Sequence, residues 1–265
     1  VVDYAVGWND SVRAVTNVAA ALAADVYAAP FHVQGVCDML HPTFKGALPP
    51  TTSEVREILS GYDTVLLLGE KIDTFTYTGD QSVPHEVRLI QITPATDQLG
   101  FDWPADIAVV GDITTSLSGI GAELGIDVDA EIGVDERTPD LAALRAAHRA
   151  AGADPSAELI LSVLEQLDPT ATHVVTEGSS EDALVQEMAT AMGFRNVHFS
   201  PRGGALGWAM PLSVGLSLGT GEPAVCFVGD GGSLFSVHAI WTAATMKIPV
   251  VFVCFVNHEY RLLKD

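Results

Sequence analysis

The sequence predicts an α/β protein built from two doubly wound, parallel-sheet domains of the Rossmann-like type. Short apolar runs alternate with helical patterns along most of the chain, which is typical of successive βαβ units. Some of these runs, such as AVCFV at 224–228, lack polar alternation and so indicate strands buried on both faces. An acidic, alanine-rich stretch at 131–155 interrupts the alternation and separates the two halves.

The first domain is expected to span residues 1–130. Apolar runs predict its strands, and alanine-rich or amphipathic patterns predict its helices. The expected strands are 1–7, 25–29, 64–68, 87–93 and 107–110, and the expected helices are 10–24, 52–60 and 114–124.

Residues 131–155 contain two prolines and predict a linker with one solvent-facing helix. The second domain is expected to span residues 156–265, with a glycine-rich turn at 202–207. Its expected helices are 156–167, 181–192, 208–218 and 234–246, and its expected strands are 172–178, 196–200, 224–230 and 249–257.

The composition limits the classes of function. The 265 residues include 34 Asp and Glu against 13 Lys and Arg, for a net charge of −21, which disfavours nucleic acids and anionic membranes as partners. Hydrophobic residues make up 48%, which excludes global disorder. The dispersed acidity fits either a protein adapted to high salt, where self-repulsion is screened, or an ordinary acidic protein.

Three cysteines occur, and two of them, Cys226 and Cys254, stand inside apolar runs. We expect both to be buried as small hydrophobic residues. The odd count and the lack of a signal peptide favour a reducing cytoplasm. No apolar run reaches the roughly 18 residues of a membrane span.

The most informative segment begins where an apolar strand ends in GDGGS and continues to the end of the next apolar strand, at Asn257. Two neighbouring parallel strands would bring Asp230 and Asn257 to the same edge of the sheet, where ligands bind in such folds. Their oxygens suit Mg²⁺, Gly231 and Gly232 let backbone N–H groups approach a phosphate, and Ser233 adds a hydroxyl. The sequence therefore predicts an Mg²⁺-bridged diphosphate site. The alternatives are a capped tight turn for GDG and a turn-forming amide for Asn257.

This segment resembles the thiamine diphosphate motif of the 2-oxo acid decarboxylase and acetolactate synthase superfamily, which opens with GDG and closes with asparagine. The Trp-Thr-Ala-Ala stretch at 241–244 is most similar to the benzoylformate decarboxylase branch. The resemblance implies thiamine diphosphate and Mg²⁺ as cofactors. It also implies Asp230 and Asn257 as side-chain metal ligands, Glu259 as a backbone-carbonyl ligand and Tyr260 as a cofactor-binding residue.

The resemblance extends upstream through RGGALGWAMPLSVGLSLG at 202–219. There Gly204 would accept the cofactor's amino group through its carbonyl, and Leu206 would hold the cofactor in its bent form. In the stretch TEGSSEDA, Ser179 and Ser180 would bind diphosphate oxygens. A glycine turn with a core leucine and an ordinary serine helix cap are the alternatives.

The first half resembles the superfamily's central domain, notably in HPTFKGALPP at 41–50. Members that bind FAD there use a His-Gly pair, which this stretch lacks, so no FAD is expected. His41 is expected to be a packing residue of the loop. The decarboxylase branch places a catalytic histidine where residues 73–81 hold none, which leaves the acyl substrate open.

The resemblance implies a carbon–carbon lyase that decarboxylates a 2-oxo acid, in a homodimer or homotetramer with its active site at a subunit interface. The alternatives are an acetolactate synthase-like carboligase, a non-catalytic subunit of the same fold and, with little support, a generic nucleotide-binding protein. The superfamily's pyrimidine-binding domain, with the glutamate that starts catalysis, is absent from these residues, and so is the end of the diphosphate-binding domain. We therefore expect a portion of a longer polypeptide that is inactive alone.

Overall fold

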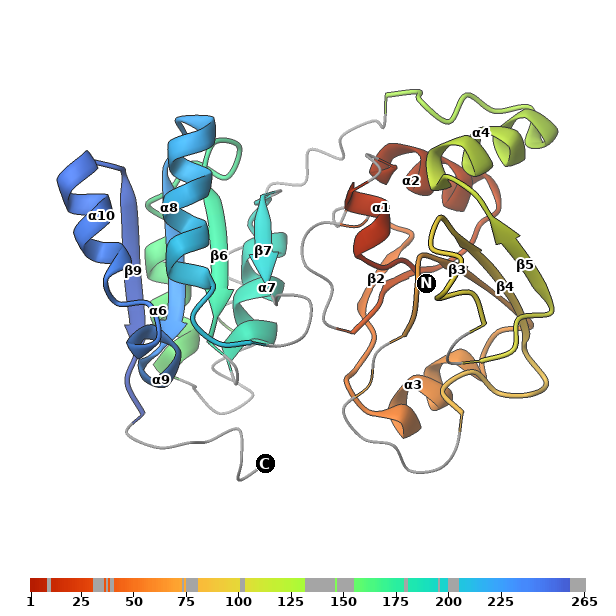
Figure 1. Cartoon of the computed structure of the whole chain (residues 1–265), viewed down its shortest axis with the longest axis horizontal. Helices are drawn as coiled ribbons and strands as arrows, with labels where there is room; N and C mark the ends of the chain where they lie inside the picture. The colour runs from red at the N-terminus through yellow and green to blue at the C-terminus, as the bar shows by residue number, and fades with distance from the viewer. Residues whose placement is uncertain are drawn as a thin grey trace. The chain divides into compact units, whose positions relative to one another are not determined.

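The chain folds into two compact units, Val1–Asp135 and Glu136–Asp265. A computed structural model describes residues 1–8, 11–30, 36, 38, 41–72, 74, 81–100, 103–131, 146, 155–178, 181–194, 196–199 and 205–257. Each unit contains parallel β-sheet with helices packed against it (Figure 1). The predicted fold class is therefore confirmed.

The first unit is a parallel sheet whose two parts meet at Val2. The strand orders are β1-β2 and β3-β4-β5, and Val2 forms bridges to both Ala28 and Leu68. Its elements are α1 (Tyr4–Trp8), α2 (Val12–Ala21), β1 (Val26–Ala28), β2 (Phe44–Ala47), α3 (Thr52–Leu59), β3 (Thr64–Leu68), β4 (Arg88–Thr93), β5 (Ile107–Val110) and α4 (Ile113–Leu124).

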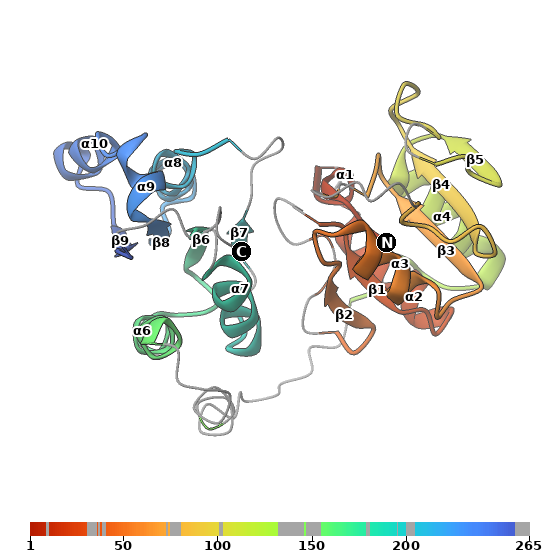
Figure 2. The ribbon, with the colours of Figure 1, turned by 90° about the horizontal axis from the view of Figure 1, so that it is seen from below.

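Helices pack against the strands of this unit (Figure 2). Alternate side chains of β3 enter two separate cores, as in a doubly wound sheet. Leu68 packs in one core with residues of α2 and α4. Val65 and Leu67 pack in the other with Val55 and Leu59 of α3. Helices therefore bury apolar side chains on both faces of the sheet.

The expected strand at 1–7 is wrong beyond Val2, because the chain turns into helix α1. The buried carboxylate of Asp3 causes this turn by accepting a hydrogen bond from the Ala5 N–H at 2.8 Å. Strand β2 was not predicted, because FKGA carries a lysine and a glycine and lacks a continuous apolar run.

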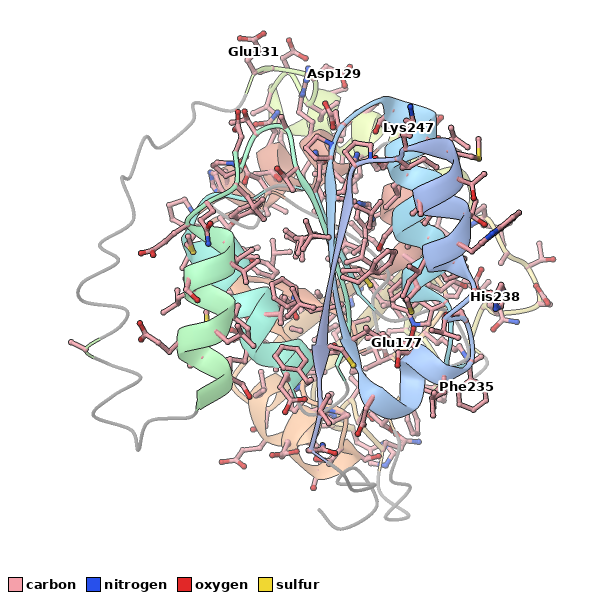
Figure 3. All side chains as sticks on the ribbon, turned by 90° about the vertical axis from the view of Figure 1, so that its left-hand side faces the viewer. Asp129, Glu131, Glu177, Phe235, His238 and Lys247 are labelled. Atoms are coloured by element: carbon pink, nitrogen blue, oxygen red, sulfur yellow. The ribbon has the colours of Figure 1, made fainter. Side chains whose placement is uncertain are left out.

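The second unit is a four-stranded parallel sheet in the order β7-β6-β8-β9. Its helices lie on both faces, with α6 and α7 on one side and α8 and α10 on the other (Figure 3). Its elements are α6 (Pro155–Leu164), β6 (His173–Glu177), α7 (Asp182–Ala191), β7 (Val197–Phe199), α8 (Ala209–Thr220), β8 (Ala224–Gly229), α9 (Asp230–Leu234), α10 (Ala239–Met246) and β9 (Val250–Phe255).

The single helix expected at 234–246 is two helices. Helix α9 ends at Leu234, and a turn at 235–238 precedes α10. Within this turn the N–H of Phe235 donates to the carbonyl of Gly232 at 3.2 Å, a tighter bond than the α-helical pattern. Residues 230–234 consequently form a helical turn of their own at the end of β8.

Cys226 is buried, as expected, but the burial expected for Cys254 is wrong, because its side chain is exposed. Cys254 lies on β9, at the edge of the described sheet, where only β8 pairs with it among the described strands. Among the described residues, no helix is both long and apolar enough to cross a membrane.

Candidate functional site

The register of β8 and β9 determines where the motif residues lie. The strands are parallel neighbours, and Gly229 pairs with Phe255 at their carboxyl ends. Asp230 follows Gly229 directly, and Asn257 follows Phe255 by two residues. Both polar side chains therefore start from the same edge of the sheet, where the helical turn α9 also begins.

Asp230 is half-buried, and one of its carboxylate oxygens, Oδ1, accepts a hydrogen bond from the N–H of Gly231 at 2.8 Å. In the part of the chain that the structure describes, no basic side chain forms an ion pair with it. The hydroxyl of Ser233 donates to the Asp230 carbonyl at 2.7 Å, which ties the turn together. Among the described residues, this carboxylate has no cationic side chain as a partner, and such a group suits a bound metal ion.

The two glycines that follow Asp230 have different surroundings. A Cβ added to Gly231 would meet nothing within 4 Å, so its backbone has the space that a ligand needs. A Cβ on Gly232 would instead lie 3.0 Å from Oε1 of Glu177. The GDGG turn thus has open space at Gly231 and packs against a buried carboxylate at Gly232.

Glu177 is the site residue that sequence reasoning missed. It ends β6, is only 5% exposed and accepts hydrogen bonds from the N–H groups of Gly207 and Ala209, the latter at 2.8 Å (Figure 3). The available signal was an acidic residue at the end of the predicted strand 172–178, since glutamates buried in a sheet are rare and need partners.

The turn before α8 packs against the end of α9. Gly207 has a φ of +90°, and a Cβ there would lie 2.5 Å from Cβ of Phe235. Glycine is therefore required both by the backbone conformation and by the close approach. Leu206, the residue expected to prop the cofactor, directly precedes this turn and is 41% exposed.

The loop that follows β6 is anchored by Asp182 at the start of α7. Its Oδ1 accepts hydrogen bonds from the Thr176 hydroxyl at 2.5 Å and the Gly178 N–H at 2.6 Å. The predicted diphosphate ligands Ser179 and Ser180 lie in this loop but outside the described residues. Three more predicted site residues also lie outside them: Gly204, Glu259 and Tyr260.

Two groups near these segments are held in their neutral forms. Burial raises the pKa of the Cys226 thiol to about 12. Burial, and secondly the neighbouring His173, lowers the pKa of His198 to about 4. The His198 ring lies 3.3 Å from His173, which begins β6, whereas Glu177 ends that strand.

His238, which lies within the helix expected at 234–246, is exposed at the start of α10.

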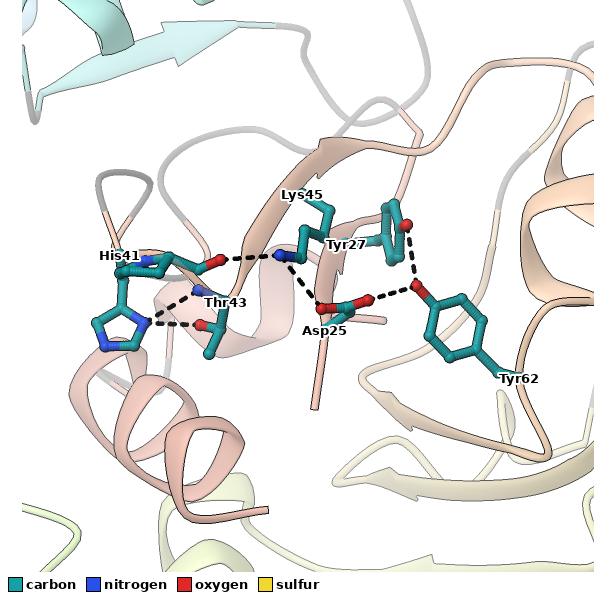
Figure 4. A network of polar contacts seen from close by, with 7 residues as sticks. Asp25, Tyr27, His41, Thr43, Lys45 and Tyr62 are labelled. Carbon is teal, nitrogen blue, oxygen red and sulfur yellow. Dashed lines mark hydrogen bonds and ion pairs between the residues drawn. The ribbon is translucent and has the colours of Figure 1, made fainter. Parts of the chain in front are cut away.

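His41 has a local structural role in the first unit, as expected of a loop residue. Its Nδ1 contacts the Thr43 hydroxyl at 2.8 Å (Figure 4). In the same network the Tyr62 hydroxyl donates to Asp25 at 2.7 Å, and Lys45 lies 3.4 Å from Asp25. The Tyr62 hydrogen bond is the main cause of the lowered pKa of Asp25. These contacts stabilise the loop before β2.

The donor set at the carboxyl edge decides which metal would fit. Among the described residues, no cluster of three His, Cys, Asp or Glu side chains could hold a metal ion. Beyond β8 and β9 the edge offers instead the carboxylate of Asp230 and the amide of Asn257. Hard oxygen donors that leave further coordination positions to a phosphate match the preferences of Mg²⁺. The residues present therefore fit a magnesium-bound diphosphate.

Comparison with known proteins identifies the family of this chain. Residues 1–120 match the family model described as the central domain of thiamine pyrophosphate enzymes, and residues 178–265 match the C-terminal TPP binding domain of those enzymes. This chain belongs to the thiamine pyrophosphate enzyme family. The resemblance inferred from the sequence is confirmed.

Two curated relatives are decarboxylases. Benzoylformate decarboxylase of Pseudomonas aeruginosa is 25% identical over 84% of this chain and 41% of its own length. Oxalyl-CoA decarboxylase of Escherichia coli is 25% identical over 75% of the chain and 37% of its own length. This thiamine pyrophosphate enzyme chain thus spans about two fifths of the length of these relatives.

A solved structure shows the same fold. The thiamine diphosphate-dependent 4-hydroxybenzoylformate decarboxylase of Rhodococcus jostii RHA1 superposes with a TM-score of 0.78. The match covers 99% of this chain and 49% of that chain, at 24% identity. The likeness shows that the fold of thiamine pyrophosphate enzymes is shared.

Proposed function

We propose that this chain supplies two domains of a thiamine diphosphate- and Mg²⁺-dependent lyase that decarboxylates a 2-oxo acid. Residues 1–130 would be the central domain, 131–155 the linker and 156–265 the cofactor-diphosphate domain. The observation that carries the proposal is that Asp230 and Asn257 both follow strand ends at one edge of a parallel sheet.

The metal would be held by oxygen atoms from both strand ends. Asp230 and Asn257 would contribute side-chain oxygens, and Glu259 its backbone carbonyl. The metal would neutralise the charge of the diphosphate, and backbone N–H groups of the GDGG turn would face its oxygens. The residues assigned to the cofactor are Ser179, Ser180, Gly204, Leu206, Gly231, Gly232, Ser233 and Tyr260.

The chain's own contribution is to bind and orient. Thiamine diphosphate supplies, when bound, the electron sink that makes loss of CO₂ from a 2-oxo acid possible. Leu206, which is partly exposed beside the rigid Gly207 turn, would hold the cofactor's two rings in their bent arrangement. The carbonyl of Gly204 would accept a hydrogen bond from the cofactor's amino group.

A second subunit would complete the active site, in a homodimer or homotetramer. The support is an apolar surface on α9, the following turn and α10, where Leu234 is 76% exposed and Trp241 is 72% exposed. Large exposed apolar side chains in a chain with a net charge of −21 mark a contact surface. The other apolar members of this surface are Phe235, Val237, Ile240 and Met246.

The names of the two curated relatives, benzoylformate decarboxylase and oxalyl-CoA decarboxylase, support a substrate whose carboxylate lies next to a ketone or a thioester carbonyl. Two alternatives have separate consequences. A carboligase would bind the same cofactor but join two carbonyl compounds, and a non-catalytic subunit would not bind it.

The free thiol forms of Cys226 and Cys254 support a reducing, cytoplasmic setting.

Calorimetry with thiamine diphosphate and MgCl₂ tests the proposal. The unsubstituted chain should bind the cofactor only when Mg²⁺ is present. Asp230→Ala should lose this magnesium-dependent binding. Asp168→Ala is the matched control, since it removes the same charge from an exposed loop of the same unit. Equal binding by Asp230→Ala and the unsubstituted chain would contradict the metal assignment, and no binding at all would favour the non-catalytic alternative.

A further inference from the structure

The buried carboxylate of Glu177 has no role in the proposed function, yet it joins three segments of the second unit. It belongs to the carboxyl end of β6, where its residue pairs with Val228 of β8. Its oxygens accept the N–H groups of Gly207 and Ala209 at the start of α8. It also packs against the GDGG turn, because Oε1 lies at the position that a Cβ of Gly232 would crowd.

The charge of Glu177 is stabilised by the end of a helix. Helix α8 is twelve residues long, and its first N–H groups have no partners within the helix. The N-cap residue, Trp208, makes no capping bond with its side chain, so the carboxylate of Glu177 takes that role from another strand. A carboxylate is favoured at this position by both the two N–H donors and the helix dipole.

The fit between Glu177 and the GDGG turn depends on the absence of a side chain at Gly232. Its ideal Cβ would lie 3.0 Å from Oε1 and 3.4 Å from the carboxyl carbon of Glu177. A glycine at position 232 therefore allows the turn to lie close to the Glu177 carboxylate, where a larger side chain would not fit. A movement of the Glu177 carboxylate would therefore change the distance between the GDGG turn and the start of α8.

The second contact between these segments is apolar and equally tight. Gly207 packs against Phe235, directly after α9, on the side of the turn that leads to Leu206. The two turns thus meet twice, once through Glu177 and once through Phe235. Both contacts sit beside residues assigned to the cofactor, Leu206 on one turn and Gly232 on the other.

We propose that Glu177 is a positioning residue for the cofactor. It holds the turn that carries Leu206, which would face the cofactor's rings, in register with the turn that carries Asp230, which would face its diphosphate. The inference rests on the proposed function, because it assigns a role in binding the same molecule. Glu177 acts through Gly207, Ala209 and Gly232 and does not itself touch the cofactor.

Glu177→Gln separates positioning from packing. The glutamine keeps the length and shape of the side chain but presents an NH₂ group to one of the two N–H donors, so one hydrogen bond and the charge are lost. Glu177→Asp keeps the charge and shortens the side chain by one methylene. Its carboxylate can therefore reach only some of the groups at Gly207, Ala209 and Gly232. The two variants lose the contact in different ways and should show the same defect.

Ser213→Ala is the matched control. Ser213 is buried in α8 and donates a hydrogen bond to the carbonyl of Ala209, so its removal perturbs the same helix. Among the described residues, it forms no hydrogen bond with the GDGG turn or with the turn at Leu206. Any loss of cofactor binding that follows from a weakened α8 alone would appear in this variant.

Two measurements test the inference well below the melting temperature. Titration with thiamine diphosphate and MgCl₂ should show about a tenfold higher Kd for both Glu177 variants and a Kd within twofold of the unsubstituted value for Ser213→Ala. Without cofactor, amide hydrogen exchange at Gly207 and Ala209 should accelerate in the Glu177 variants and not in Ser213→Ala.

Unchanged Kd values in both Glu177 variants would overturn the inference while leaving the proposed function intact. Unchanged exchange at Gly207 and Ala209 would overturn it as well. Absence of cofactor binding by the unsubstituted chain would instead contradict the proposed function, and the inference with it. A higher Kd in Ser213→Ala equal to that of Glu177→Gln would show that α8 stability alone explains the effect.

Discussion

Gly229 and Phe255 are register partners at the carboxyl ends of two parallel strands, and this pairing sets the geometry of the site. Because of it, Asp230 and Asn257 leave the sheet at the same edge although 27 positions separate them in the sequence. A one-residue slip between the strands would move one of the two side chains to the other face. The relative position of Asp230 and Asn257 therefore depends on the register of β8 and β9.

Gly207→Ala should destabilise the second unit by about 2–4 kcal/mol. The alanine would have to adopt a positive φ, and its methyl group would overlap Cβ of Phe235. Gly215→Ala is the control, because its Cβ would meet nothing within 4 Å inside α8 and should stabilise the helix by about 0.5–1 kcal/mol. Urea unfolding measures both, and equal stability of the two variants would show that the Gly207 turn is not constrained.

Asp3 should make the first unit less stable as the pH rises from about 4 to 6. Burial raises the pKa of Asp3 to about 6, so the folded unit binds the proton more tightly than the unfolded chain does. The stabilisation is complete below the unfolded pKa and is lost as the pH rises through 6, by about 3 kcal/mol.

The difference in unfolding free energy between the unsubstituted chain and Asp3→Asn isolates this effect from the other acidic residues. The unfolding free energy of the unsubstituted chain should fall relative to that of Asp3→Asn as the pH rises from about 4 to 6. A difference that stays constant between pH 4 and 7 would mean that Asp3 titrates normally.

His198 should give the second unit the opposite pH dependence. The pKa of His198 is lowered to about 4, chiefly by burial, so the folded unit keeps the ring neutral. This stabilisation is present above about pH 6.5 and is lost as the pH falls toward 4, by about 3 kcal/mol. His198→Gln should remove the dependence, and His238→Gln, in an exposed turn, serves as control. NMR titration that finds His198 protonated at pH 6 would refute the assignment.

Trp241→Glu should dissociate the assembly that the proposed function requires. The side chain is 72% exposed on α10, and a carboxylate placed in a buried interface would remain unpaired. Sedimentation velocity should show a smaller species for this variant. Leu22→Glu, at an exposed apolar residue of the first unit, should leave the assembly unchanged. An unaltered sedimentation coefficient for Trp241→Glu would place the interface elsewhere.

The strands near the site could be predicted because they are continuous apolar runs. The run at 224–230 became β8, one residue shorter, and the run at 249–257 became β9, three residues shorter. Parallel strands of a doubly wound sheet end at the same edge, so the meeting of Asp230 and Asn257 followed from the order of elements alone.

The errors arose where tertiary contacts override local pattern. The run at 1–7 is apolar enough for a strand, but the buried Asp3 carboxylate starts a helix after Val2. Cys254 lies in an apolar run, yet β9 is an edge strand of the described sheet and exposes it. The role of Glu177 could not be inferred, because its partners at Gly207 and Ala209 are thirty or more positions away.

A crystal structure of the chain with thiamine diphosphate and MgCl₂ is the most direct test of the central claim. We expect one ion between β8 and β9, with an Asp230 carboxylate oxygen and the Asn257 amide oxygen each about 2.1 Å from it and a diphosphate oxygen in the same coordination shell. Oxygens of Asp230 and Asn257 that point apart, with the diphosphate bound elsewhere or absent, would contradict it.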